Sequence, residues 1–220
     1  MKKHLIKFII TFLGFMSNDS FAIKKCEQNS ILQIESYLKS ISSHAITFEQ
    51  IESDQTLHTG VLLIKKPDIF RANYDSPHPL VIVGSKNFVS LYDYELDELS
   101  RVEAKDNIFK FLLEKDLSIQ KNINIQTCQE DKQFLALTLS HAQTQQIAKV
   151  IFKKSPFALH ELVTPEDGVN FEKNVIIIRF GKVYNMSKYL PELFTLKNPK
   201  VYGPPKRYKS DQIIKMIEKK

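Results

Sequence analysis

Residues 60–93 read GVLLIKKPDIFRANYDSPHPLVIVGSKNFVSLYD, and this stretch decides the fold class of the chain. Short apolar runs alternate in it with turn residues, among them Pro67-Asp68 and the run from Gly84 to Asn87. The links between the runs are short, so the strands that they join should be antiparallel neighbours. No group in the stretch is arranged for catalysis. It therefore predicts a sheet with apolar surfaces rather than an active site.

The same pattern extends to both sides of this stretch. A period of two runs from Ala45 to about Val102, and strands resume from Ile123 to Phe180. An amphipathic helix over Ser30–Ser42 precedes these strands, and a short helix over Asp106–Glu114 that is apolar nearly all round interrupts them. So many strands in one small domain favour strong curvature. We predict a mainly β (α+β) fold, an incomplete antiparallel β-barrel of about ten or eleven strands, with an ordinary sandwich as the alternative.

The N-terminus has the pattern of a cleaved secretory signal. A basic start precedes an apolar run over residues 5–16, and Ser20 and Ala22 are small residues of the kind that signal peptidase reads. The run is too short to span a bilayer stably, although an uncut membrane anchor is the alternative. We expect a signal peptide over residues 1–22, one domain over residues 23–205 and a basic tail over residues 206–220.

The C-terminal end gives weaker patterns. Tyr189–Phe194 is a candidate edge strand, which Pro191 makes less favourable, and residues 203–205 are expected to end the ordered structure. In the tail, Ile213, Ile214 and Ile217 fall close to one helical face. Such a helix could contact a membrane or a partner, but a frayed end is the more common outcome.

The two cysteines, Cys26 and Cys128, both follow the predicted cleavage site. Cys26 comes after Ile23-Lys24-Lys25 rather than the small apolar residues of a lipoprotein acylation site, which favours a soluble product over an anchored one. In an oxidising compartment the two thiols could form a disulfide. Spacing alone leaves that pairing open.

The sequence also argues against an enzyme, a metal site and a nucleic-acid interface. The histidines are scattered without metal-ligand spacing, and two Ser-x-x-Lys matches, at residues 36–39 and 118–121, lack the partner motifs of that hydrolase class. The acidic residues at positions 93–98 are more typical of a solvated strand face than of a cation site. No basic run is interleaved with aromatic residues. We therefore predict no catalytic residue, no metal, no cofactor and no nucleic-acid partner.

An ordered series of short motifs resembles one known family. Phe48-Glu49-Gln50 is followed by Gly-x-Leu-x-x-basic-basic-Pro-x-x-Phe-Arg-x-x-Tyr over residues 60–74, by Asp-x-Pro-x-Pro over residues 75–79 and by Tyr92-Asp93. In this order, behind a signal peptide, they resemble the LolA-like family of periplasmic outer-membrane lipoprotein carriers. The resemblance is good over residues 46–117 and looser up to residue 205.

The resemblance implies a half-barrel whose mouth is covered by helices and whose cavity shields acyl chains. The implied partners are acylated lipoproteins, an inner-membrane lipoprotein-releasing ABC transporter and, if present, an outer-membrane lipoprotein receptor. The implied location is the periplasm, and we expect a monomer. A carrier of free lipid, or a lipid sensor, on the same scaffold is the alternative that the sequence leaves open.

Strand parity within such a barrel gives candidate cavity residues, although a slip of one residue would turn each strand over. They are Leu62, Ile64, Phe70, Ala72, Tyr74, Val81, Val83, Phe88 and Tyr92. The two helices give the candidate lid residues Ile34, Leu38, Phe109, Leu112 and Leu113. Lys66 stands where the family usually has an arginine that latches the lid, so we expect Lys66 to be a weaker latch. Arg71 is expected to lie in solvent.

Overall fold

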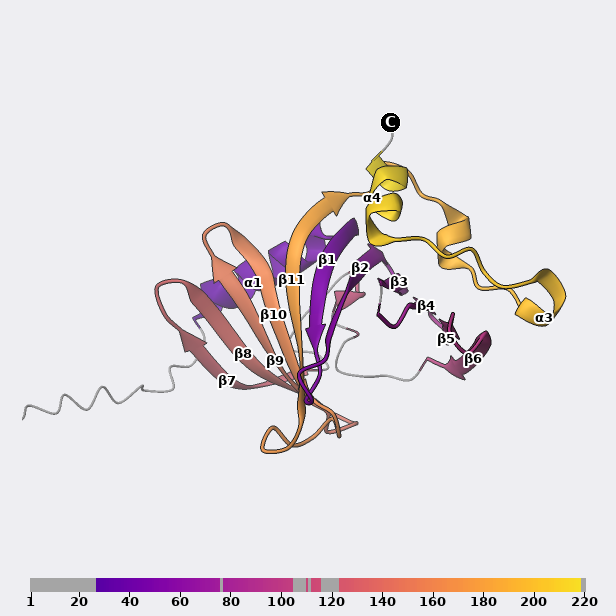
Figure 1. Cartoon of the computed structure of the whole chain (residues 1–220). Helices are drawn as coiled ribbons and strands as arrows, with labels where there is room; N and C mark the ends of the chain where they lie inside the picture. The colour runs from indigo at the N-terminus through magenta and orange to yellow at the C-terminus, as the bar shows by residue number, and fades with distance from the viewer. Residues whose placement is uncertain (1–26, 76, 105–109, 111, 116–122, 219–220) are drawn as a thin grey trace, which may run out of the picture.

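One antiparallel sheet of eleven strands dominates the computed structural model, which describes residues 27–75, 77–104, 110, 112–115 and 123–218. The strand order is β6-β5-β4-β3-β2-β1-β11-β10-β9-β8-β7, so β6 and β7 are the two free edges of the sheet (Figure 1). The strands are β1 (Ser43–Ile51), β2 (Leu57–Lys65), β3 (Ile69–Tyr74), β4 (Leu80–Gly84), β5 (Phe88–Asp93), β6 (Glu98–Glu103), β7 (Ile123–Glu130), β8 (Phe134–His141), β9 (Ile147–Lys154), β10 (Phe157–Pro165) and β11 (Val175–Asn185). The predicted mainly β fold with an unclosed antiparallel sheet is confirmed.

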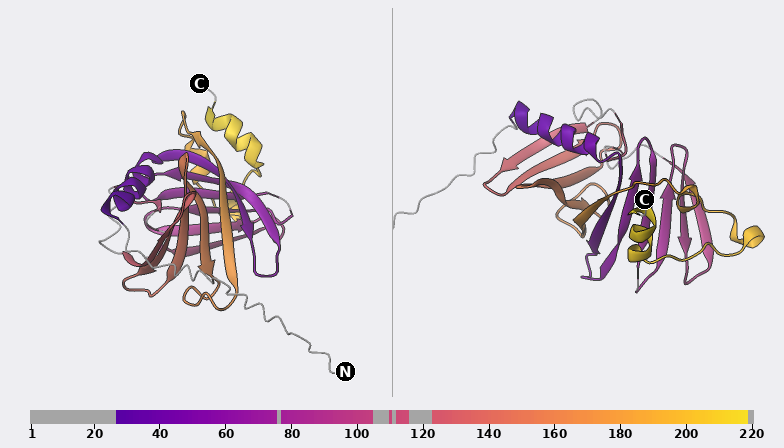
Figure 2. Two further views of the ribbon diagram at one scale, coloured as in Figure 1. Left: turned by 90° about the vertical axis from the view of Figure 1, so that its left-hand side faces the viewer. Right: turned by 90° about the horizontal axis from the view of Figure 1, so that it is seen from above.

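The sheet is bent so that its two halves face each other across a concave side (Figure 2). Register shifts interrupt the pairing of β1 with β11, of β9 with β10 and of β7 with β8. Such bulges bend a strand and increase its local twist. The bulges therefore curve the sheet. It stays open, since its edge strands β6 and β7 do not pair with each other.

Helix α1 (Gln28–Ser40) fills part of the concave side. Its buried stripe of Ile31, Ile34 and Leu38 belongs to one cluster with the inward residues of β8 and β9, such as Leu137 and Phe152. The stripe follows the i, i+3, i+7 spacing that the sequence shows. The predicted helix therefore forms, two residues earlier than expected at each end.

The C-terminal segment covers the convex side of β1–β5 with η2 (Pro191–Phe194) and α4 (Ser210–Glu218), whereas α3 (Pro199–Tyr202) between them has no buried residue and projects from the molecule (Figure 1). Ile213 and Ile217 of α4 are fully buried against Ala45, Val61 and Leu63. The expectation of a frayed tail is therefore wrong, as is the expected end of ordered structure at residues 203–205. The candidate edge strand over Tyr189–Phe194 is also wrong: Pro191 begins a short 3-10 helix there, since proline cannot donate to a strand ladder.

Several N-terminal predictions lie outside the described residues. The predicted signal peptide is among them, and so is Cys26. Cys128 is buried on β7 and is disulfide-bonded. Because Cys26 lies outside the described residues, the pairing of the two cysteines stays a prediction. No helix in the described part of the chain is both long and apolar enough to cross a membrane.

Candidate functional site

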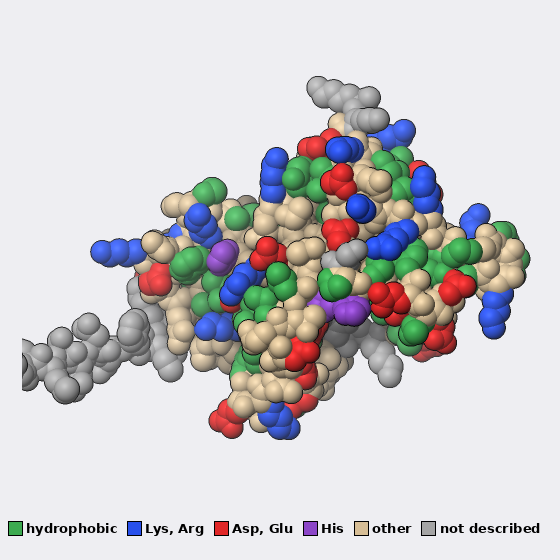
Figure 3. Space-filling model, in the orientation of Figure 1, with side chains coloured by type: hydrophobic (Ala, Val, Ile, Leu, Met, Phe, Trp, Pro, Cys, Tyr) green, Lys and Arg blue, Asp and Glu red, His purple; other side chains and the backbone are tan. Residues whose placement is uncertain are grey.

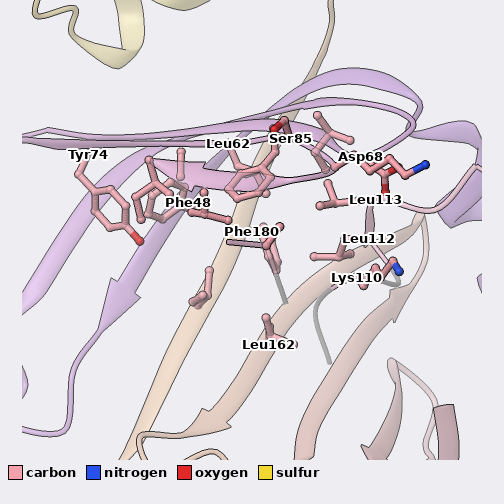
Figure 4. A pocket seen from close by; sticks show the side chains of 18 residues that line it. Phe48, Leu62, Asp68, Tyr74, Ser85, Lys110, Leu112, Leu113, Leu162 and Phe180 are labelled. Atoms are coloured by element: carbon pink, nitrogen blue, oxygen red, sulfur yellow. The ribbon is translucent and has the colours of Figure 1, made fainter. Parts of the chain in front are cut away.

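The concave side of the sheet encloses an apolar cavity of about 730 Å³. Figure 4 shows Tyr74 at one end of it, and Asp68 and Lys110 at the other. Its volume falls within the ~300–1,000 Å³ of pockets that bury small organic molecules. Aliphatic and aromatic side chains make up most of the lining, which consists of Phe48, Leu62, Ile64, Asp68, Phe70, Ala72, Tyr74, Ile82, Ser85, Lys86, Val89, Ala104, Lys110, Leu112, Leu113, Leu162, Ile178 and Phe180.

Strands β2 and β3 contribute five of the nine residues that strand parity assigned to the cavity. Cross-strand pairs join Leu62 to Ala72 and Ile64 to Phe70, so these four side chains share one face of the sheet. Tyr74 continues that face at the end of β3. All five line the cavity.

Strands β4 and β5 have the opposite parity to the one expected. Val81, Val83 and Tyr92 are buried on the convex side in a cluster with Leu196, and Phe88 is 47 % exposed. The assignment of these four residues to the cavity, Val81, Val83, Phe88 and Tyr92, is therefore wrong.

The pairing of β3 with β4 explains this error. Ala72 pairs with Ile82 and Phe70 pairs with Gly84, which puts Ile82 rather than Val81 on the cavity side. Every residue of β4 before Gly84 is apolar, because the C-terminal segment covers its outer face. A strand that is buried on both sides gives no alternation from which the inward face can be read.

The Phe48-Glu49-Gln50 motif shapes the Tyr74 end of the cavity. The Phe48 and Tyr74 rings meet edge to face with centroids 5.0 Å apart, and the Tyr74 hydroxyl donates to Gln50 Oε1 at 2.8 Å. Burial raises the pKa of Tyr74 to about 12, so it stays protonated. Phe48 is not among the cavity residues that strand parity predicts, although its place in the motif could have indicated it.

Gly84 gives the Phe70 ring its place in the cavity wall. The three atoms nearest to a Cβ built on Gly84 all belong to that ring, the closest of them at 1.8 Å. Because Gly84 has no side chain, the Phe70 ring can lie against the sheet at this position, where it lines the cavity.

We therefore expect Gly84→Ala to lower the free energy of unfolding by about 1 kcal/mol, since overpacking displaces the ring. Chemical denaturation measures the loss. The cost should disappear in a Phe70→Ala background, where the ring is absent. An equal cost in both backgrounds would contradict the contact as its cause.

The predicted lid residues lie at two places on the concave side. Ile34 and Leu38 are buried in the α1 stripe, and Leu112 and Leu113 line the cavity in one helical turn, where the Leu113 N–H donates to the Lys110 carbonyl at 2.9 Å. Phe109, the fifth candidate, lies outside the described residues.

Lys66 contacts helix α1 directly. Its Nζ donates to the backbone carbonyl of Leu38 at 2.7 Å, and the residue is only 9 % exposed. Leu38 is in the last turn of α1, where carbonyls have no partner within the helix and a positive charge is favourable. Burial lowers the pKa of Lys66 to about 8, an effect that Glu114 partly offsets. The bond joins the residue that follows β2 to helix α1 on the concave side.

The sequence from residue 39 to residue 197 matches the family described as outer membrane lipoprotein carrier protein LolA. The chain belongs to the LolA family. It is also 35 % identical over 217 residues to the uncharacterized protein RP864 of Rickettsia prowazekii (strain Madrid E), covering 98 % of this chain and 97 % of that one.

Two solved structures are more distantly similar. The LolA superfamily protein NE2245 from Nitrosomonas europaea gives a TM-score of 0.43 at 10 % identity, over 76 % of this chain and 97 % of that one. An uncharacterized conserved protein from Thermus thermophilus gives a TM-score of 0.44 at 13 % identity, over 83 % and 96 %. The LolA match itself supports a general role in carrying lipid or lipoprotein.

The buried Lys66 should make the stability of this LolA-family protein depend on pH. Its folded-state pKa of about 8 lies below the ordinary value of 10.5, so between the two the unfolded chain binds more protons. Raising the pH through this window therefore favours the folded state. We expect the Lys66 contribution to raise the free energy of unfolding by about 1–2 kcal/mol between roughly pH 7.5 and pH 9.5.

Urea midpoints of the natural protein and of Lys66→Leu test this expectation. The stability of the natural protein relative to the variant should increase as the pH rises across the window, because only the natural protein has the titrating group. A difference that stays constant with pH would be evidence against a lowered Lys66 pKa.

Arg71 lies on the convex side and is not in solvent. It is 3 % exposed, and its guanidinium donates to the Leu193 carbonyl at 2.9 Å and to Asn73 Oδ1 at 2.8 Å. The expectation of a solvated Arg71 is wrong because the C-terminal segment covers β3. Within the described residues, no group of three or more His, Cys, Asp or Glu side chains could hold a metal ion.

Proposed function

We propose that this protein is a periplasmic carrier that accepts lipoproteins from the inner-membrane export machinery, shields their acyl chains and delivers them to the outer membrane. The observation that carries the proposal is the apolar cavity of about 730 Å³ on the concave side of the sheet, the side to which Lys66 also bonds helix α1. Each methylene kept from water contributes roughly 0.8 kcal/mol. An acylated protein therefore does not cross an aqueous compartment unaided, and an apolar cavity can shield acyl chains without covalent chemistry.

The lining supports reversible binding rather than chemistry. Phe48, Leu62 and Phe180 offer apolar contact area, while the charged Asp68, Lys86 and Lys110 also line the cavity. Apolar contacts do not depend on direction, so the cavity can bind the acyl chains of lipoproteins that differ in sequence. The partners in this proposal are an inner-membrane lipoprotein-releasing ABC transporter and, where one is present, an outer-membrane lipoprotein receptor.

Release of lipoproteins from spheroplasts tests the proposal. Spheroplasts with radiolabelled lipoproteins are incubated with the purified mature protein, and the supernatant is fractionated by size. We expect labelled lipoprotein in a soluble complex with the protein, and none above background when bovine serum albumin replaces it. Absence of labelled lipoprotein, with phospholipid in the purified protein instead, would favour a carrier or sensor of free lipid.

A further inference from the structure

A second, smaller pocket lies on the convex side, between β3 and the C-terminal segment. It has a volume of about 240 Å³, and its lining includes Arg71, Lys197, Lys206, Glu192 and Tyr208. The β-sheet separates it from the apolar cavity, which shares none of these residues. It is too small and too polar to extend the acyl-binding space.

Arg71 is a buried cation. No carboxylate forms an ion pair with it among the described residues. The acceptors of its two bonds are a carbonyl and an amide, and its Nε has no hydrogen-bond partner in this part of the chain. Burial lowers the pKa of the guanidinium, an effect that Tyr94 and Tyr208 only partly offset. Buried charges in proteins are ordinarily paired.

Attachment of the C-terminal segment does not require this charge to be buried. Arg101 makes an equivalent attachment, donating to Ser90 Oγ at 2.9 Å and to the Leu196 carbonyl at 3.0 Å, from an exposed position. Asn73 attaches the segment as a neutral donor, to the Tyr208 carbonyl at 3.0 Å. Of these three side chains, only that of Arg71 lines the pocket, where a bound anion would satisfy it.

The other charges of the pocket also favour an anion. Lys197 and Lys206 line it with Arg71, against a single carboxylate, that of Glu192. Their ammonium groups lie over the Tyr202 and Tyr208 rings, 5.1 and 5.0 Å from the centroids, which restrains them. Basic side chains flank the end of the molecule at which α3 projects (Figures 1 and 3).

We propose that this convex pocket binds a phosphate group, with Arg71 as the buried donor and Lys197 and Lys206 as the outer cations. Arginine offers a fork of donors that matches phosphate oxygens. The group could belong to a free phosphate or to a phospholipid head group, which present the same chemistry. The pocket does not depend on the carrier function, because it lies on the other face of the sheet.

Calorimetric titration of the mature protein with inorganic phosphate tests the site, with chloride at equal ionic strength as the reference. We expect saturable binding of phosphate, a loss of at least about tenfold in affinity in Arg71→Met, and unchanged affinity in Arg101→Met. Arg101→Met is the matched control, because it also removes a bond to the C-terminal segment but lies outside the pocket lining. Equal affinities in the natural protein and in Arg71→Met would overturn the proposal, as would the absence of saturable binding.

Two variants at the rim keep the test valid if Arg71→Met does not fold. Glu192→Gln removes the carboxylate of the pocket and should tighten phosphate binding, and Lys206→Gln should weaken it, each by roughly threefold or more. No change in either variant would contradict the site.

Sedimentation with vesicles identifies the source of the phosphate. If the ligand is a head group, the protein should sediment with phosphatidylglycerol vesicles, and inorganic phosphate should reduce the amount that sediments. Phosphate binding without vesicle binding assigns the site to a free phosphate. Vesicle binding that neither phosphate nor Arg71→Met reduces would show that the pocket is not the site of contact and would overturn the proposal.

Discussion

Leu62→Asp is expected to lower the release of lipoprotein from spheroplasts by about 100-fold or more. Leu62 is half-buried in the middle of β2 and its side chain lines the cavity. An acyl chain bound there would remove water from the new carboxylate, and burial of an unpaired charge costs several kcal/mol. The variant should still fold, because Leu62 is only half-buried and its side chain borders a cavity. The amount of labelled lipoprotein in the soluble complex measures the effect.

The matched control is Leu57→Asp on the same strand. Leu57 is 48 % exposed and does not line the cavity, so the same change of charge there should leave release within about twofold of the natural protein. Circular dichroism spectra of both variants show whether each is folded. A folded Leu62→Asp protein that releases lipoprotein as well as Leu57→Asp does would place the acyl chains elsewhere.

The parity of β3 could be read from the sequence, whereas that of β4 and β5 could not. In β3 the polar Arg71 and Asn73 alternate with Phe70, Ala72 and Tyr74, which separates two faces even though both are buried. β4 has no polar residue to mark a face. In β5 the larger side chains of Phe88 and Tyr92 favoured the wrong face, since both faces of that strand meet apolar surroundings.

An apolar run in β2 indicates that the convex side is covered, although the run alone does not show which segment covers it. The run from Val61 to Ile64 is apolar without alternation, which is typical of a strand covered on both faces. Leu62 and Ile64 face the cavity, and Val61 and Leu63 face α4. The apolar face of α4 packs against the face of β2 that Val61 and Leu63 form, so each explains why the other is apolar.

The buried cations were the least predictable part of the site. The hydrogen bonds of Lys66 to the lid helix and of Arg71 to the C-terminal segment end on backbone carbonyls, those of Leu38 and Leu193. Any residue type supplies such an acceptor, so no side chain in the sequence marks it. The family resemblance indicates a role for Lys66. It indicates none for Arg71, and the sequence therefore predicts a solvated side chain there.

Lys66→Leu is expected to slow delivery of lipoprotein to acceptor membranes by about tenfold or more while loading is retained. We take the arrangement in which Lys66 Nζ donates to the Leu38 carbonyl as the closed state, and leucine leaves that buried carbonyl without its partner. A buried acceptor left unsatisfied costs about 1–3 kcal/mol. The closed state competes with the loaded one, so its loss strengthens the hold on the cargo by the same free energy. Transfer of labelled lipoprotein from the soluble complex to outer-membrane vesicles measures delivery.

Two further variants separate a latch from a general effect of lysine. Lys65→Leu changes the neighbouring residue, whose Nζ lies over the Tyr189 ring at 5.7 Å, and should deliver as the natural protein does. Lys66→Arg keeps a donor for the Leu38 carbonyl and should restore delivery. It should also hold the lid more firmly near neutral pH, because guanidinium is more weakly hydrated than the ammonium whose pKa burial lowers to about 8. Equal delivery by Lys66→Leu and Lys65→Leu would refute the latch, and a parallel loss of loading and delivery would make Lys66 a residue of stability alone.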